Sequence, residues 1–164
     1  MHDGTSWSES AKLVAPDADD FDYFGISVAI DGSTVVVGSS ADDHNTFTLA
    51  GAAHVFAHDG TSWVHEAKLM ASDAKSGDRF GNSVAIDGST VVVGAGLNDP
   101  FGFTDAGAAY VFMHDGTSWS ESAKLVASSL QARVEFGSSV AIDGSTVVVG
   151  ATYDGASGVT NAGA

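Results

Sequence analysis

Short runs of β-branched and apolar residues, separated by glycine-containing turns, recur along the whole chain. Residues 83–94 read Ser-Val-Ala-Ile, then Asp-Gly-Ser, then Thr-Val-Val-Val-Gly. Such runs are typical of strands, and Asp-Gly accepts the positive φ of a tight hairpin turn. The stretch therefore predicts two antiparallel strands. The uninterrupted Val-Val-Val run further predicts a strand that is covered on both faces.

A second hairpin is predicted after the first. Residues 108–112 read as a third strand, Asp115-Gly116 as its turn, and residues 118–125 as a fourth strand with alternating polar side chains. The two hairpins together make a unit of four antiparallel strands.

This unit repeats with a period of 56 residues. His-Asp-Gly-Thr-Ser-Trp begins at His2, His58 and His114. The twelve residues 27–38 recur unchanged at 83–94 and 139–150. We expect a single segment, 1–164, of three repeats at approximately 1–56, 57–112 and 113–164, the last one truncated.

The repeat predicts the fold class. A four-stranded sheet of this size cannot cover both apolar faces by itself, so such units stack radially and bury their faces against their neighbours. The predicted fold is all-β, a β-propeller segment of three four-stranded antiparallel blades. Because propellers typically need about four to eight blades, three do not close a ring.

Two alternatives account for the open ring. The chain is either a piece of a longer array, or a half-ring that a second copy completes to six blades. In the second case residues 6–13, predicted as a fourth strand, complete the last blade of the other copy. Open blade edges favour self-association.

Composition and charge exclude some classes of binding partner. The chain has 6 Lys and Arg against 21 Asp and Glu, a formal net charge of −15. Such a surface cannot neutralise a run of phosphates, so we expect no nucleic acid partner and no membrane insertion. The sequence has no cysteine, which excludes disulfides and thiolate chemistry.

Several of the repeated motifs carry a resemblance to a known family. Phe80-Gly81 is followed by the strand residues 83–86 and 91–95, by Gly-Ala-Ala-Tyr-Val-Phe at 107–112, and by Trp119 with Ala-Lys-Leu at 123–125. This order resembles the FG-GAP repeat, the blade unit of integrin-α-type propellers and of many secreted bacterial surface proteins. The resemblance implies an extracellular or cell-surface propeller.

One feature of integrin-type blades is missing from these repeats. Those blades often carry a calcium loop, Asp-x-Asp-x-Asp-Gly, between the first two strands. Here the connection is only Asp31-Gly32, Asp87-Gly88 or Asp143-Gly144. A turn this short offers too few of the about six to eight oxygens that Ca²⁺ takes. The bacterial subtype with short turns is therefore the better comparison.

The repeats differ mainly in two connections. The parity of a four-stranded blade places the 2–3 and 4–1 connections on one face and the 1–2 and 3–4 turns on the other. Varied loops on an invariant framework are typical of a binding scaffold, whereas relaxed drift in solvated loops is the alternative. The 4–1 connections are 16–23, 72–79 and 128–135, and the 2–3 connections are 39–49, 95–105 and 151–161.

We expect ligand contacts in these variable loops, with a protein or a glycan as the ligand. The candidates are the charged and aromatic residues Asp19, Asp20, Asp22, Asp42, Asp43, His44, Asp78, Arg79, Asp99, Phe101, Asp105, Tyr153 and Asp154.

The densest carboxylate cluster is a candidate calcium site. Asp17, Asp19, Asp20 and Asp22 could chelate Ca²⁺ through carboxylate oxygens, together with Asp42 and Asp43. The alternative is that these acidic loops only keep the protein soluble.

For catalysis the sequence offers little. A catalytic constellation is singular, whereas nearly every Asp, Ser and His here occupies a repeated position. The non-repeated His44, His54 and His65 are scattered along the chain. We therefore expect a non-enzymatic binding or adhesion scaffold. A self-assembling structural subunit without a separate ligand is the alternative, and a propeller hydrolase that uses a non-repeated carboxylate such as Asp105 is less favoured.

Overall fold

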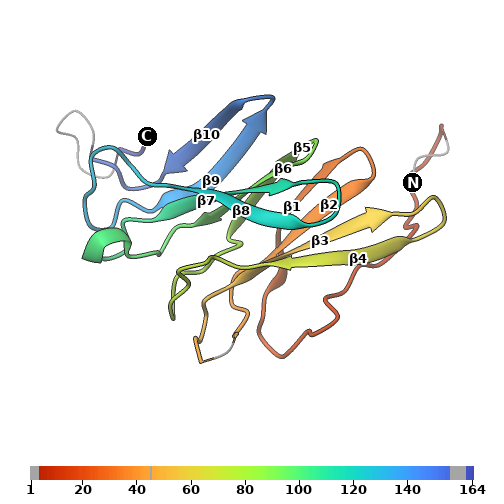
Figure 1. Cartoon of the computed structure of the whole chain (residues 1–164), viewed down its shortest axis with the longest axis horizontal. Coiled ribbons are helices and arrows are strands. Elements are labelled where there is room, and N and C mark those ends of the chain that lie inside the picture. Colours follow the sequence, from red (N-terminus) through yellow and green to blue (C-terminus); the bar gives the residue numbers. More distant parts are fainter. Residues whose placement is uncertain (1–3, 45, 156–161) are drawn as a thin grey trace.

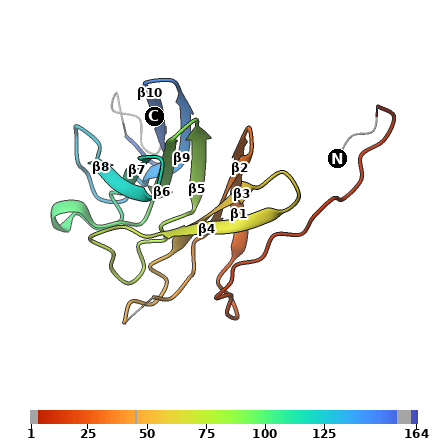
Figure 2. The same cartoon turned by 45° about the vertical axis from the view of Figure 1, so that its right-hand side comes forward.

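The computed structural model of the chain describes residues 4–44, 46–155 and 162–164. Its strands form three antiparallel sheets that fan out side by side (Figures 1 and 2). Neighbours in the sequence are neighbours in each sheet. Blade 1 consists of β1 (Phe24–Asp31), β2 (Thr34–Ser39), β3 (Ala52–His58) and β4 (Trp63–Leu69). Blade 2 consists of β5 (Ser83–Asp87), β6 (Thr90–Ala95), β7 (Ala108–His114) and β8 (Trp119–Leu125). Blade 3 consists of β9 (Phe136–Asp143) and β10 (Thr146–Ala151). A short 3₁₀ helix, η1 (Pro100–Gly102), lies between β6 and β7.

The predicted strands and hairpins are confirmed, with one exception. Residues 6–13 form no strand and show only an isolated bridge at Trp7. β4 and β8 each form by pairing with the strand before them, β3 and β7. Residues 6–13 follow no described strand, and they run apart from the three sheets (Figure 2). The same sequence pattern therefore forms a strand in β4 and β8, where the third strand of the blade lies beside it.

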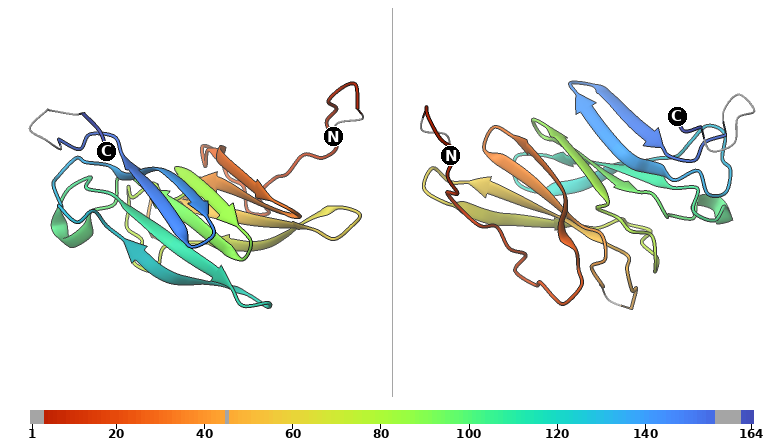
Figure 3. Two further views of the ribbon diagram at one scale, coloured as in Figure 1. Left: turned by 90° about the horizontal axis from the view of Figure 1, so that it is seen from above. Right: turned by 180° about the vertical axis from the view of Figure 1, so that it is seen from behind.

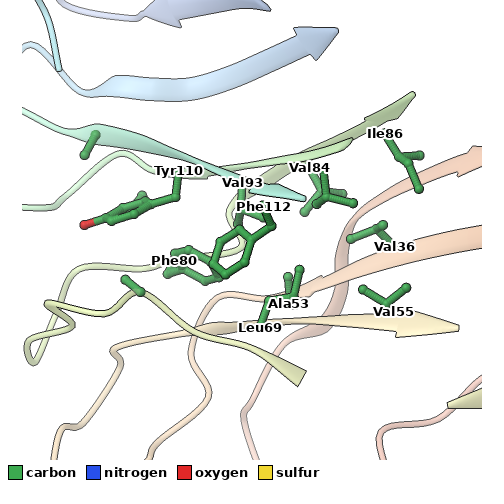
Figure 4. Packing of buried hydrophobic residues seen from close by; sticks show 14 residues of the cluster. Val36, Ala53, Val55, Leu69, Phe80, Val84, Ile86, Val93, Tyr110 and Phe112 are labelled. Atoms are coloured by element: carbon green, nitrogen blue, oxygen red, sulfur yellow. The ribbon is translucent and has the colours of Figure 1, made fainter. Parts of the chain in front are cut away.

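The core lies between the faces of adjacent blades. Val36, Ala53 and Val55 of blade 1 face Val84 and Ile86 of blade 2 (Figure 4). At the loop end of this interface, three aromatic rings are packed edge to face, with Phe80 5.4 Å from Tyr110 and 5.9 Å from Phe112. The Val-Val-Val strand is covered on both faces, as predicted, because Val91, Val92 and Val93 of β6 are all fully buried.

The blades approach one another backbone to backbone at glycine. A Cβ atom on Gly38 would lie 1.9 Å from the carbonyl oxygen of Gly81, the second residue of the Phe-Gly pair of blade 2. The hydroxyl of Ser27 donates a hydrogen bond to the same carbonyl at 2.8 Å. Between blades 2 and 3 the same contacts recur at Gly94, Gly137 and Ser83.

The hairpin turns on the opposite face link the blades a second time. The N–H of Gly88 donates to Asp31 Oδ2 at 2.7 Å, and the N–H of Gly144 donates to Asp87 Oδ2. Each Asp-Gly turn therefore binds the turn of the next blade. Gly88 has a φ of 54°, as the sequence requires for a tight turn.

We predict that Gly94→Ala destabilises the stack, because its Cβ would lie 2.0 Å from the carbonyl oxygen of Gly137. The expected loss in the free energy of unfolding is about 3 kcal/mol, at the upper end for overpacking. Urea denaturation followed by circular dichroism measures it. Gly96→Ala is the matched control, because its nearest neighbours would be 3.7 Å away. Equal effects of the two substitutions would contradict the close-approach explanation.

Candidate functional site

The 2–3 and 4–1 connections meet on one face, as predicted. The N–H of Arg79 donates to the carbonyl of Leu49 at 3.2 Å, and the N–H of Glu135 donates to the carbonyl of Asp105 at 3.1 Å. The second and third 4–1 connections, 72–79 and 128–135, therefore bind the 2–3 connection of the preceding blade. Figure 3 shows the fan of sheets that carries this variable-loop face from above and from behind.

One cavity on this face is shared by all three blades. It has a volume of about 450 Å³ and is lined by Tyr23, Arg79 and Glu135, among other residues. These three residues occupy the same repeat position, directly before Phe-Gly. Their φ angles are 58°, 59° and 55°, in the left-handed region that non-glycine residues seldom adopt. Three blades thus present an aromatic, a cationic and an anionic side chain on the same backbone conformation. We call this the shared cavity.

Burial affects the charge of one of its residues. Burial raises the pKa of Glu135, and the nearby carboxylate of Asp105 raises it further. Both effects favour the protonated form.

A second cavity, of about 420 Å³, gathers the predicted calcium ligands. We call it the acidic cavity; its acidic lining residues are Asp17, Asp19, Asp20, Asp22, Asp42 and Asp43. Within it, the carboxylate of Asp22 accepts the N–H of Asp19 at 2.7 Å, and that of Asp19 accepts the N–H of Asp20 at 2.8 Å. These two carboxylates thus cap backbone groups of their own loop, and the calcium site stays a prediction.

A lysine from β4 lies between two of these carboxylates. The Nζ atom of Lys68 is 2.7 Å from Asp17 Oδ2 and 2.8 Å from Asp42 Oδ2. Burial of the ammonium opposes protonation, yet the hydrogen bonds to the two carboxylates raise the pKa of Lys68. The hydrogen bond from Lys68 lowers the pKa of Asp17, whereas burial outweighs it at Asp42 and raises that pKa.

The equivalent place in blade 2 holds a closed polar network. Lys124 Nζ contacts Asp73 Oδ2 at 2.7 Å and Asn98 Oδ1 at 2.8 Å. The Tyr110 hydroxyl donates to Asp73 Oδ1 at 2.8 Å, and the Asn98 amide donates to Asp78 Oδ2 at 2.8 Å. Burial raises the pKa of Asp78. At Asp73 the hydrogen bonds from Lys124 and Tyr110 outweigh burial and lower the pKa.

The remaining predicted residues lie at separate places on the face. Asp99 and Phe101 line a cavity of about 300 Å³ next to Lys124. Asp105 and Tyr153 line another, of about 310 Å³. Asp154 is half-buried. Residues 156–161 of the third 2–3 connection lie outside the described residues. The structure thus distributes the candidates over several cavities rather than one.

Some residues of these sites were not singled out from the sequence. Tyr23 and Glu135 join Arg79 in the shared cavity. His54 is fully buried, and its Nδ1 lies 3.1 Å from His65 Nε2. A comparison between the repeats carries the signal for His54, because an otherwise constant strand changes there: position 54 becomes Tyr110 in blade 2. Tyr23 and Glu135 are the last residues of their variable 4–1 connections.

Three stacked antiparallel sheets joined by glycine contacts define blades of a β-propeller-type repeat domain. The FG-GAP repeat family matches residues 7–56, 63–112 and 119–164, so the chain belongs to this family. A search of curated proteins found no significant match. Among the described residues, no helix is long and apolar enough to cross a membrane.

We predict that Tyr110→Phe destabilises the protein by about 1 kcal/mol, because it removes one hydrogen bond to Asp73. The pKa of Asp73 should rise at the same time, since one of the two side-chain hydrogen bonds that lower it is lost. Urea denaturation and an NMR titration of the carboxyl groups measure the two effects. Tyr153→Phe, at a side chain that is 45% exposed, is the control and should change neither. An unchanged Asp73 pKa in Tyr110→Phe would contradict the network.

Proposed function

We propose that this FG-GAP propeller segment is an extracellular, non-catalytic binding or adhesion scaffold whose protein or glycan ligand contacts the variable-loop face at the shared cavity. The supporting observation is the convergence of Tyr23, Arg79 and Glu135 on one cavity from equivalent positions. Strained backbone of this kind persists only where the surrounding structure holds it, and it clusters at functional sites. Here the strain is kept in three blades while the side chain changes.

Exposed aromatic side chains on the same face support the proposal. Phe21 and Phe101 are 80% and 83% exposed, and Phe103 is also exposed. All three belong to the variable connections. Aromatic anchors of this type supply much of the energy at binding interfaces. Membership of the FG-GAP repeat family supports the extracellular assignment.

We predict that Arg79→Ala and Tyr23→Ala weaken ligand binding by at least about tenfold, the effect of about 1.4 kcal/mol at a contact residue. A glycan array and a displayed peptide library are the probes for a first ligand, and titration calorimetry then compares the variants. Lys12→Ala is the matched control, since it removes a positive charge at an exposed residue that does not line the cavity. Equal loss in Lys12→Ala, or full binding by both cavity variants, would contradict the assignment.

The alternative function, a self-assembling subunit, is favoured by the outer faces of the fan. Val28 and Ile30 on β1 are 67% and 66% exposed, whereas their equivalents in blade 2, Val84 and Ile86, are both 9% exposed against blade 1. At the other end Val148 on β10 is 62% exposed, although its equivalent Val92 is fully buried.

The repeat itself identifies what fits these faces. The strands of blade 1 and blade 2 that carry them share the sequence 27–38 and 83–94. The equivalent face of blade 2, which carries Val84 and Ile86, is covered by blade 1. We propose that the occupant at blade 1 is blade 3 of a second copy, which gives a head-to-tail assembly.

We predict that the 164-residue chain forms a discrete dimer by light scattering after size exclusion, and that Ile30→Glu yields monomer because a charge cannot be buried there without a partner. Val64→Glu, at a 49%-exposed residue of β4, is the control and should leave the dimer intact. A monomeric wild-type chain, or a dimer that persists in Ile30→Glu, would contradict head-to-tail docking.

A further inference from the structure

Two buried polar groups face each other at the loop end of blade 1 without a hydrogen bond. The side chains of His54 and Asp42 are 0% and 3% exposed, and His54 Nε2 is 4.0 Å from Asp42 Oδ2. Neither His54 Nε2 nor Asp42 Oδ1 has a hydrogen-bond partner among the described residues. A buried polar atom without a partner destabilises the fold, so a ligand that binds both atoms would be stabilising.

Blade 2 shows how the same scaffold satisfies these positions when they need no ligand. Asn98 stands in place of Asp42, and its amide both accepts from Lys124 and donates to Asp78. A carboxylate can accept but cannot donate, so Asp42 cannot make the second bond to Asp22, the equivalent of Asp78. The exchange of amide for carboxylate therefore leaves Asp42 Oδ1 open.

The second exchange leaves a buried histidine nitrogen without a described partner beside the other oxygen of Asp42, Oδ2. Tyr110 closes the blade 2 network by donating to Asp73. In blade 1 its place is taken by His54, whose Nε2 makes no such bond within the described part of the chain. Asp17, the equivalent of Asp73, supplies a third ligand atom, and the three atoms of Asp17, Asp42 and His54 lie within 4.8 Å of one another.

His65 orients the histidine of this group. Its Nε2 lies 3.1 Å from His54 Nδ1. When His54 donates its Nδ1–H to His65, its Nε2 carries the lone pair and faces the two carboxylates. An outer hydrogen bond of this kind fixes the tautomer of most metal-binding histidines.

We infer that the loop end of blade 1 binds a divalent transition-metal ion such as Zn²⁺ through Asp17, Asp42 and His54, with His65 as the positioning residue. One imidazole nitrogen and two carboxylates suit Zn²⁺, with solvent at the remaining position. Ca²⁺ prefers six to eight oxygens, and a nitrogen ligand disfavours it. The ligand set therefore differs from that of the calcium site predicted from the sequence, although Asp17 and Asp42 belong to both.

Lys68 competes with the metal ion. Its ammonium lies against both carboxylates, at 2.7 and 2.8 Å. The ion takes the place of this ammonium, and the Lys68 side chain, which is 21% exposed, turns towards solvent. Removing the lysine should therefore strengthen metal binding, an effect opposite to that expected if the cluster were only an ion pair.

Titration calorimetry of the untagged 164-residue chain with ZnCl₂ tests the site. We expect one ion per chain, a loss of at least about 100-fold in affinity for Asp42→Asn with His54→Tyr, and a loss of about 10–100-fold for His65→Ala. The double variant installs the blade 2 residues, which this scaffold accommodates. Lys68→Met should bind more tightly than the wild type. His58→Gln removes a histidine from the end of β3 next to the hairpin turn and should bind as the wild type does.

Three results would overturn the inference: wild-type affinity in the double variant, equal loss in His58→Gln, or binding of Ca²⁺ in place of Zn²⁺, which would support the calcium prediction instead. Nitrogen-15 NMR of the histidines in the wild-type chain keeps the test independent of whether the variants fold. Zn²⁺ should shift the His54 Nε2 signal, and no shift on saturation would also overturn the inference.

Discussion

The close contact between the backbones of adjacent blades is the constraint on which the other features of the fold depend. The carbonyl oxygen of Gly81 occupies the space where a side chain on Gly38 would begin, and the hydroxyl of Ser27 binds that oxygen. No residue other than glycine leaves this space, and a small hydroxyl side chain reaches the carbonyl without separating the sheets. The apolar faces can meet along their whole length only because the blades come this close. The constancy of the Phe-Gly pair and of the Val-Val-Val-Gly strand follows from this contact.

The same contact separates the framework from the variable loops. It brings each 4–1 connection against the preceding 2–3 connection, where backbone groups bind backbone groups, as in the bond from the Arg79 N–H to the Leu49 carbonyl. Backbone hydrogen bonds do not depend on side-chain identity. The residue before Phe-Gly can therefore be Tyr23, Arg79 or Glu135 while its φ angle stays within a few degrees. The loops can change their chemistry without a change in how the blades stack.

The sequence was sufficient for the strands, the hairpins and the stacking, because all three are local patterns repeated at a fixed period. It could not place Lys68. In a regular hairpin Lys68 would lie on the face opposite to His54. A β-bulge between Val55 and Phe56 shifts the register so that Lys68 pairs with His54, on the face that also carries His65. Periodicity alone does not reveal a bulge. Residues 6–13 carry the same strand pattern but form no strand within the part of the chain that the structure describes, so the local pattern predicted too much.

The polar clusters at the loop ends vary between blades because they do not hold the blades together. The exchange of Asp42 for Asn98 and of His54 for Tyr110 changes most hydrogen bonds of the cluster. The strands beneath keep the same register nonetheless, with Val36 opposite Val55 in blade 1 and Val92 opposite Val111 in blade 2. Since stacking depends on glycine and apolar contacts, a buried carboxylate without a full set of partners can persist in one blade. The stability of the whole stack offsets the unfavourable burial of this carboxylate. Blade 1 can therefore hold the proposed cation, which the closed polar network of blade 2 would not bind.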